Sequence, residues 1–251
     1  MKKTLLLLAA FLAMPAAFAA DAGDGRSQAI VITYHAAPAN RVALRKALEE
    51  DEAPRLERWK REGVLKDARL LVNRHIDSAT WDAMAILTFA GANEAERWDR
   101  VVEKETPAGL SPRALALVSA IETAPADIVR AGGKASAGGP LIVIPYEVTV
   151  PVPEYVAYLE GYVVPQMDGW MQEGVLASYA VALPRYPAGR PWQSLLVLEY
   201  CDDAALAARD ATTAKVRARL KDNPKWKAIS DAKKSVRNEK PPVVADAIAP
   251  R

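Results

Sequence analysis

The sequence predicts an α+β protein built from two tandem copies of one unit, each with the order strand, helix, strand, strand, helix, strand. Three observations predict this class: an internal repeat, a small-residue segment between the copies, and the same succession of apolar patterns in both. The chain has 251 residues, of which 51% are apolar. That is enough for two modest cores or one large shared core.

The internal repeat has a constant offset. The segment 59–65 recurs as 170–176, and Trp81 recurs as Trp192 (170 − 59 = 111 and 192 − 81 = 111). Further pairs keep this offset, namely Pro54 and Pro165, Arg74 and Arg185, Leu87 and Leu198, and Asp99 and Asp210. Because the pairs are spread over most of each half, the repeat indicates two copies of a whole fold unit.

The boundary between the copies is a run of small residues, Gly-Gly-Lys-Ala-Ser-Ala-Gly-Gly-Pro, at 132–140. Such a segment has little apolar surface to bury, so we predict a flexible linker there. The first repeat then spans 28–131 and the second spans 141–248.

The first residues predict export. Residues 1–19 have a basic start, an apolar run and a small-residue end, which is typical of a cleavable bacterial signal peptide. The run is short for a membrane span and is interrupted by Pro15. We therefore expect a periplasmic or secreted protein that keeps no stable membrane anchor after cleavage.

Charge and cysteine content exclude some functions. Removal of Lys2 and Lys3 with the signal peptide leaves 31 basic residues (33 − 2 = 31) against 31 acidic ones. A neutral mature chain argues against a nucleic-acid partner, which needs a basic surplus. The single cysteine, Cys201, excludes an intrachain disulfide. His-Glu-x-x-His and Cys-x-x-Cys motifs are absent from the sequence, which predicts no metal site.

The first strand and helix of each copy follow from local patterns. Short β-branched runs at 30–34 and 141–146 predict the opening strands. A helical period predicts a helix from about Asn40 to Glu62 and its counterpart in the second copy. Pro54 and Pro165 fall inside these helices, so we expect a kink or a break there. Gly63 and Gly174 end them.

Two further strands follow in each copy, at 65–74 and 81–89 and at 176–185 and 192–200. In the later strand of each copy, one face begins with Trp81 or Trp192 and is predicted to be apolar. The opposite face is mixed and carries Thr88 in the first copy and Glu199 in the second.

Capping residues and prolines predict where the last helices of each copy begin. Asn93 and the pair Asp202-Asp203 open the next helical regions, while Ser111-Pro112 and Asn223-Pro224 signal further helix starts. Each copy closes with a short apolar strand, near 127–129 and 243–245.

This order of elements is the ferredoxin-like arrangement, whose sheet leaves one face free for a partner. The chain resembles the dimeric α+β barrel superfamily, in particular its NIPSNAP-like, EthD-like and antibiotic-biosynthesis-monooxygenase-like branches. The resemblance rests on the helix-borne Trp59 and Trp170, the helix prolines, the Glu-Gly-Val-Leu exits and the Trp-led strands, and it covers nearly the whole mature chain. It implies that the two repeats pair into a barrel within one chain.

Histidine is the first candidate for chemistry. The resemblance implies a histidine in or near the barrel, and the EthD-like pattern places one two residues before the helix proline, where this chain has Glu52 and Val163. His35 and His75 are the only histidines. They stand at strand ends, aligned with Glu147 and Tyr186, and histidine side chains exchange protons near neutral pH.

Other candidate ligand-binding residues stand at strand ends. Arg74 and Arg185 keep one charge in both copies and would hold a carboxylate or phosphate, or else form salt bridges. Tyr34 and Tyr146 end the first strands of the two copies, and Glu147 follows Tyr146. Glu199 becomes a site candidate if its face lines the barrel, and is a surface charge otherwise. The four repeated tryptophans are expected in the core, with ligand stacking as the alternative.

From these patterns we expect an exported protein that binds a small, partly apolar molecule in its barrel and needs no metal. The alternative, implied by the resemblance, is a cofactor-independent monooxygenase-like or haem-handling enzyme that depends on His35 or His75. A third interpretation is a structural or protein-interaction module, which a tightly filled barrel would favour. No motif names the ligand, the oligomeric state or the process served.

Overall fold

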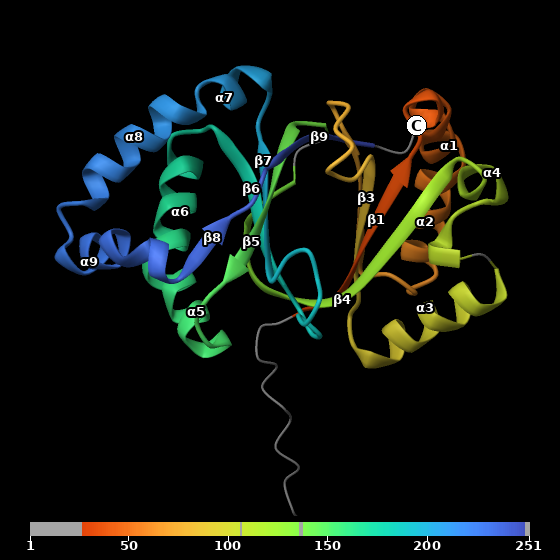
Figure 1. The fold of residues 1–251 in the computed structure, drawn as a ribbon, viewed down its shortest axis with the longest axis horizontal. Helices are drawn as coiled ribbons and strands as arrows, with labels where there is room; N and C mark the ends of the chain where they lie inside the picture. The colour runs from red at the N-terminus through yellow and green to blue at the C-terminus, as the bar shows by residue number, and fades with distance from the viewer. Residues whose placement is uncertain (1–26, 106, 136–137, 249–251) are drawn as a thin grey trace, which may run out of the picture.

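A computed structural model of the chain describes residues 27–105, 107–135 and 138–248, so the predicted signal peptide at 1–19 lies outside the described residues. Figure 1 shows two similar halves, each with its helices on the outside of a sheet. The first half contains β1 (Ser27–Ala36), α1 (Arg41–Ala47), α2 (Ala53–Arg61), β2 (Asp67–Asn73), β3 (Ala83–Thr88), α3 (Ala92–Lys104), α4 (Pro112–Leu115) and β4 (Val118–Gly133). The second contains β5 (Pro140–Val148), α5 (Val152–Tyr158), α6 (Val164–Gln172), β6 (Leu176–Pro184), β7 (Ser194–Tyr200), α7 (Asp203–Ala207), α8 (Arg209–Leu220), α9 (Pro224–Ala232), β8 (Arg237–Glu239) and β9 (Val243–Ala247).

The strands close into one antiparallel barrel. The first half has the order β4-β1-β3-β2, and the second half repeats it as β9-β5-β7-β6. The long strand β4 pairs with β1 in its own half and with β6 in the other, while β9 pairs with β5 and with β2. The short strand β8 extends β5. The predicted α+β class, with two ferredoxin-like repeats paired into a barrel within one chain, is confirmed.

The connector between the halves is shorter than the predicted linker at 132–140. Gly132 and Gly133 belong to β4, and Pro140 begins β5. Gly133 has a φ of +77°, and a Cβ there would lie 2.1 Å from the Ala177 carbonyl oxygen. The glycines therefore allow β4 to approach β6 closely, a role that the run of small residues did not indicate.

The proline-containing helices continue through their prolines. A π-helical turn, Leu48–Glu52 or Leu159–Val163, stands directly before α2 and α6, whose second residue is the proline. The wider turn accommodates the missing proline N–H, so the expected break is absent from both helices as the structure describes them. The glycine stops are confirmed, since Gly63 and Gly174 have φ values of +67° and +75°.

Three of the four predicted groups of helix starts are confirmed by side-chain caps. Ser111 accepts a hydrogen bond from the Ala114 amide at 3.1 Å, and Asp202 accepts one from the Ala205 amide at 2.7 Å. Asn223 caps α9 in the same way. The expectation for Asn93 is wrong, because α3 begins one residue earlier at Ala92 after an extended glycine.

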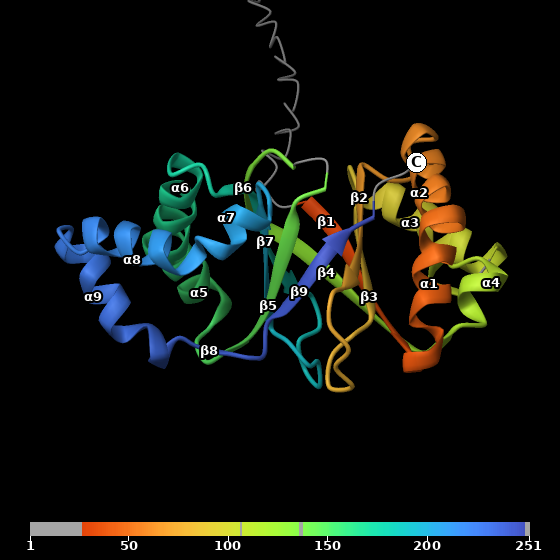
Figure 2. The ribbon, with the colours of Figure 1, turned by 90° about the horizontal axis from the view of Figure 1, so that it is seen from above.

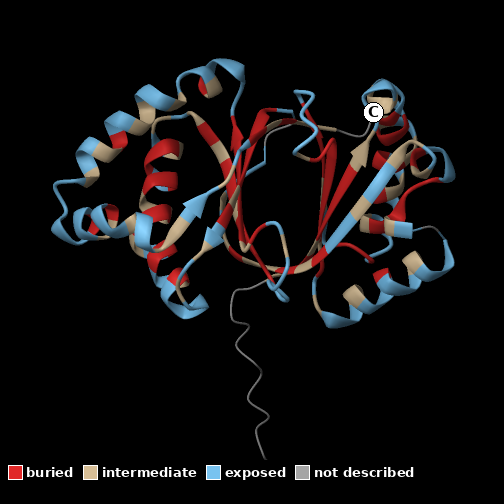
Figure 3. Cartoon of the chain, in the orientation of Figure 1, coloured by how far each residue is buried: buried red, intermediate tan, exposed pale blue. Residues whose placement is uncertain are grey.

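The core has three layers of buried residues, and Figure 3 colours the buried parts of the ribbon red. Two layers lie between the helices and the sheet of each half, with Trp59 against Trp98 in the first half at a ring-centroid distance of 5.2 Å. The third layer fills the barrel, where Met84 and Ile86 of β3 face Leu195 and Val197 of β7. The mixed face of these strands therefore lines the barrel. Within the described residues, no helix is both long and apolar enough to cross a membrane.

Candidate functional site

A cavity of about 390 Å³ opens at one end of the barrel, between the inner faces of the two halves. Met84, Leu195 and Val243 form its apolar floor, and Trp81 and Trp192 stand at its sides. Figure 2 shows the connection that follows β2 and the one that follows β6 at this same end of the barrel, and Figure 1 places them on opposite sides of its rim. Both halves of the chain thus contribute to the cavity.

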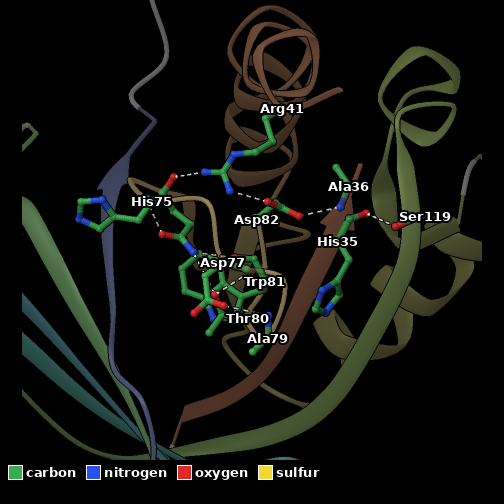
Figure 4. Close-up of polar contacts among 11 residues, drawn as sticks. His35, Ala36, Arg41, His75, Asp77, Ala79, Thr80, Trp81, Asp82 and Ser119 are labelled. Carbon is green, nitrogen blue, oxygen red and sulfur yellow. Dashed lines mark hydrogen bonds and ion pairs between the residues drawn. The ribbon is translucent and has the colours of Figure 1, made fainter. Parts of the chain in front are cut away.

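The two cavity tryptophans lie on the face opposite to the predicted one. Ala83 packs in the helix-side layer of the first half, whereas Trp81 belongs to the barrel layer. The cause is Asp82, whose carboxylate accepts hydrogen bonds from Arg41 of α1 at 2.6 Å and from the Ala36 amide at 2.7 Å (Figure 4). These bonds hold Asp82 on the helix side next to Ala83, so the alternation is broken and the Trp81 ring turns into the barrel.

A buried amide fixes the connection between β2 and β3. Asn73 is 4% exposed, and its Nδ2 donates to Thr80 Oγ1 at 3.1 Å and to the Trp81 carbonyl at 3.0 Å. Farther along the connection, Asp77 Oδ1 accepts from the Ala79 amide at 2.9 Å. Asp77, Thr80 and Trp81 are therefore placed on the cavity by an internal hydrogen-bond network, drawn in Figure 4.

The two walls of the cavity differ in polarity. Thr33 and Glu122 are paired neighbours on β1 and β4 of the first-half wall. In the second half, the corresponding position on β5 is Pro145, whose carbonyl accepts from the Lys240 amide at 2.9 Å. Pro191 also lines this wall, and Pro241 follows Lys240. The first half supplies hydroxyl and carboxylate groups where the second supplies proline rings.

The predicted histidines are separated by the fold. His35, one residue before the end of β1, lines the cavity and is half-buried, and its carbonyl accepts from Ser119 Oγ at 3.2 Å. His75 is exposed on the connection after β2, and Figure 4 shows its ring directed away from His35. Of the two, only His35 lines the cavity.

The predicted tyrosines lie on the helix side of the sheet. Tyr34 donates to the Ala108 carbonyl at 3.2 Å and Tyr146 donates to Glu239 at 3.2 Å. Burial is the first cause that raises the pKa of both phenols above the usual value. Glu147, the counterpart of His35, is exposed and pairs with Asn238 of β8.

The two repeated arginines form ion pairs. Arg74 donates to Asp246 at 2.6 Å and to Asp203 at 2.5 Å, both in the other half. Arg185 donates to Asp127 at 2.6 Å, again across the halves. The hydrogen bond from Arg74 lowers the pKa of Asp203. The structure thus gives these arginines the geometry of salt bridges between the repeats.

Glu199 lies at the opposite end of the barrel from His35. It is 2% exposed, and it accepts from Arg69 at 3.1 Å and from Ser178 Oγ at 2.7 Å. A second cavity of about 330 Å³ adjoins Arg69 and Ser178. Since Arg69 comes from the first half, this buried group joins the two repeats and is far along the barrel from the tryptophan cavity.

The tryptophan cavity does not fit haem. A haem bound through histidine carries two propionates, which are stabilised by cationic or hydrogen-bond-donating groups. The polar groups at this mouth include the carboxylates of Asp77 and Glu122, and the Lys240 ammonium already donates to the Pro191 carbonyl at 2.7 Å. His35 is the one lining side chain that could ligate the iron, while the carboxylates of Asp77 and Glu122 would repel the propionates.

Sequence reasoning found His35 but missed Asp77, Thr80, Glu122 and Asn73. For Asp77 and Thr80 the available signal was the turn composition Asp-Ser-Ala-Thr directly before Trp81. Glu122 carried no signal, because its position on the barrel depends on the register of β4 against β1.

No protein-family model matches the chain, and no curated protein matches its sequence. Solved structures do match. One described as an anthrone oxidase-like protein has 9% identity and a TM-score of 0.55 over 88% of this chain and 90% of its own. A putative monooxygenase from Fusobacterium nucleatum has 10% identity and a TM-score of 0.52, covering 88% and 92%. Another from Lactobacillus acidophilus has 13% identity and a TM-score of 0.50, covering 89% and 93%.

Proposed function

We propose that this chain, which has the fold of the dimeric α+β barrel superfamily, binds a small, partly apolar molecule in the tryptophan cavity at the end of its barrel. The observation that carries the proposal is the cavity of about 390 Å³ with Trp81 and Trp192 at its sides. Ligand sites commonly have volumes of about 300–1,000 Å³, apolar walls and a few polar groups.

The alternative of a purely structural module fits this barrel less well. Eight strands leave room for side chains to fill the interior, and Ile86 and Val197 do fill its middle. At the His35 end, the tryptophans stand beside open volume, and the polar groups of the first half are gathered at the mouth. Such a mouth orients a ligand that enters between the tryptophans.

Occluding the mouth tests the proposal. Naphthalene and phenethyl alcohol should each raise the melting temperature and change tryptophan fluorescence in the unmodified protein, because both bury apolar surface beside the rings. Ala79→Trp, at an exposed position on the mouth, should abolish both responses. Ala188→Trp, at an exposed position on the connection after β6 that is not among the lining residues, is the matched control and should retain them. Equal binding by the two variants, or no response to either compound, would overturn the proposal.

A second candidate function is oxidation of an aromatic substrate by dioxygen. One observation favours it: His35 lines the cavity and its imidazole can accept or donate a proton there. Anthrone is the compound to try, given the name of one similar structure. Its oxidation by one O₂ forms the quinone and one water, so oxygen uptake measures the reaction.

The two histidines supply the comparison for that reaction. His35→Asn should abolish anthrone-dependent oxygen uptake, whereas His75→Asn should keep it, because His75 is exposed and its ring is directed away from His35 (Figure 4). Full uptake by both variants would exclude catalysis through histidine. Absence of uptake in the unmodified protein would leave ligand binding as the function.

Export is part of the proposed function, and the basic-apolar start of the sequence supports it. Mass spectrometry of the protein from a producing bacterial cell should find a chain that begins at Ala20 in the periplasmic or secreted fraction. A chain that retains residues 1–19 in the cytoplasm would contradict this proposal without affecting the cavity.

A further inference from the structure

We propose that the ligand of the tryptophan cavity is an organic cation: an amine or amidinium group joined to an apolar ring. This inference rests on the proposed function and adds the charge of the ligand to it. It follows from two carboxylates on one cavity wall, two tryptophan rings at the sides and an apolar proline wall opposite.

The carboxylates of the first-half wall are available to a ligand. Asp77 Oδ1 accepts a backbone hydrogen bond from Ala79, and Glu122 projects from the exposed side of β4 beside Thr33. Throughout residues 27–105, 107–135 and 138–248, no salt bridge includes either carboxylate. Lys240 is the one lysine or arginine among the lining residues, so the two carboxylates leave an excess of negative charge at the mouth, which attracts a cation and repels an anion.

The tryptophans suit a cation as well. In the helix-side layer of the first half, Arg55 and Arg58 lie over the Trp59 ring at 5.1 Å and 5.7 Å from its centroid. The described cation–ring contacts involve Trp59, Tyr146 and Tyr158, and none of them covers a cavity tryptophan. An ammonium or amidinium group near a tryptophan face is stabilised by the ring quadrupole.

The difference between the walls orients the ligand. Lys240 lies on the second-half wall with its ammonium bound to the Pro191 carbonyl, so it repels a ligand cation toward Glu122 and Asp77. The rings of Pro145 and Pro191 offer an apolar surface and no N–H donor. The apolar ring of the ligand therefore packs on the proline wall while its cationic group faces the first half.

Three probes of similar size separate charge from shape: phenethylamine, phenethyl alcohol and hydrocinnamate. Calorimetric titration of the full mature chain at neutral pH and low salt should find the amine bound about tenfold more tightly than the alcohol, with hydrocinnamate weakest. Added salt should reduce the preference for the amine, because the carboxylates lie at an exposed mouth.

The variants Asp77→Asn and Glu122→Gln keep side-chain shape and remove charge. Together they should bring the affinity for phenethylamine to within about twofold of that for phenethyl alcohol. Asp222→Asn combined with Glu154→Gln, at exposed positions in the turn after α8 and on α5, is the matched control and should keep the preference.

Equal affinity for the amine and the alcohol, or a preference for hydrocinnamate, would overturn the cation inference and leave the proposed binding function standing. An amine preference that survives in the Asp77 and Glu122 double variant would overturn it too. If none of the three probes binds, the proposed function fails together with this inference.

Discussion

The two halves of the barrel have the same fold but contribute different side chains to the cavity. Trp81 and Trp192 occupy equivalent positions and both face the barrel. The residue before each tryptophan differs, since Thr80 of the first half corresponds to Pro191 of the second. The repeated positions thus maintain the fold, whereas positions where the copies have diverged determine the chemistry of the cavity.

A pair with different side chains but one role makes the distinction clearer. Asp82 accepts a hydrogen bond from the Ala36 amide, and Gln193, its counterpart, accepts one from the Val148 amide at 2.7 Å. Both side chains hold the end of the first strand of their half. The pair Asp82 and Gln193 differs in side chain but keeps a hydrogen-bond acceptor. The pair Thr80 and Pro191 differs in chemistry, because a hydroxyl in the first half is replaced by an apolar ring in the second. The hydrogen-bonding role of a residue therefore matters more than its identity.

The largest predicted loss of stability is the same for the two halves. Trp81→Ala and Trp192→Ala should each lower the free energy of unfolding by about 3–5 kcal/mol, because each removes a large side chain that is 9% or 6% exposed. Urea denaturation measures the loss. A loss below about 1 kcal/mol in only one of the variants would break the equivalence of the two tryptophans.

The next largest loss of stability is predicted where strands of the two halves pair with each other. Gly133→Ala should cost about 2–4 kcal/mol, since the new Cβ would lie 2.1 Å from the Ala177 carbonyl oxygen in a left-handed backbone. Gly174→Ala is the control. It has a similar φ of +75° with nothing within 4 Å of the new Cβ, so only the conformational cost of about 1 kcal/mol applies. Equal losses would show that β4 does not approach β6 as described.

A buried carboxyl group gives the first half a pH dependence that the second half lacks at the equivalent position. Glu52 is 3% exposed and accepts from the Ser111 amide at 2.6 Å, while Val163 stands at the equivalent position of the second half. Burial is the first cause that raises the pKa of Glu52, and the Ser111 bond opposes it. Between the usual pKa and the raised one, the unfolded chain releases the proton that the folded chain keeps. Stability contributed by Glu52 therefore falls as the pH rises through that window.

Glu52→Gln keeps an acceptor for Ser111 and cannot ionise. Relative to this variant, the unmodified protein should lose stability as the pH rises through the window and then show a constant difference. Urea midpoints at a series of pH values measure it. A difference that is the same at every pH, or one that shrinks with rising pH, would contradict the buried-carboxyl account.

The smallest effects are expected at the aligned pair His75 and Tyr186. Both side chains are exposed, and Tyr186 is 69% exposed. His75→Asn and Tyr186→Ser should change the free energy of unfolding by less than about 0.5 kcal/mol. Thermal denaturation checks this, and a shift of several degrees in either variant would show that these loops support the barrel.

Much of the fold could be predicted because local sequence patterns determine it. The glycine stops, the caps by Ser111 and Asn223 and the order of strands all follow from residues close in sequence. The inward turn of Trp81 could not, because it depends on the ion pair of Asp82 with Arg41, some 41 residues away. A strict alternation along the strand places that ring on the wrong face.

The candidate site was less predictable for the same reason. His35 stood out as one of two histidines. The residues beside it on the cavity wall, however, are determined by the register of β4 against β1 and by the connection that Asn73 stabilises. For Glu199 the sequence left both a barrel position and a surface position open, and only the tertiary structure shows that it is buried and that Arg69 binds it at the far end.

The most direct test of the central claim is a nuclear magnetic resonance titration of the tryptophan indole N–H signals with phenethylamine. The signals of Trp81 and Trp192 should shift together, while those of the other four tryptophans, which lie in the helix-side layers, should stay in place. Single Trp→Phe variants assign the six signals. Shifts confined to the helix-side tryptophans, or no shifts at saturating amine, would contradict a ligand site at the end of the barrel.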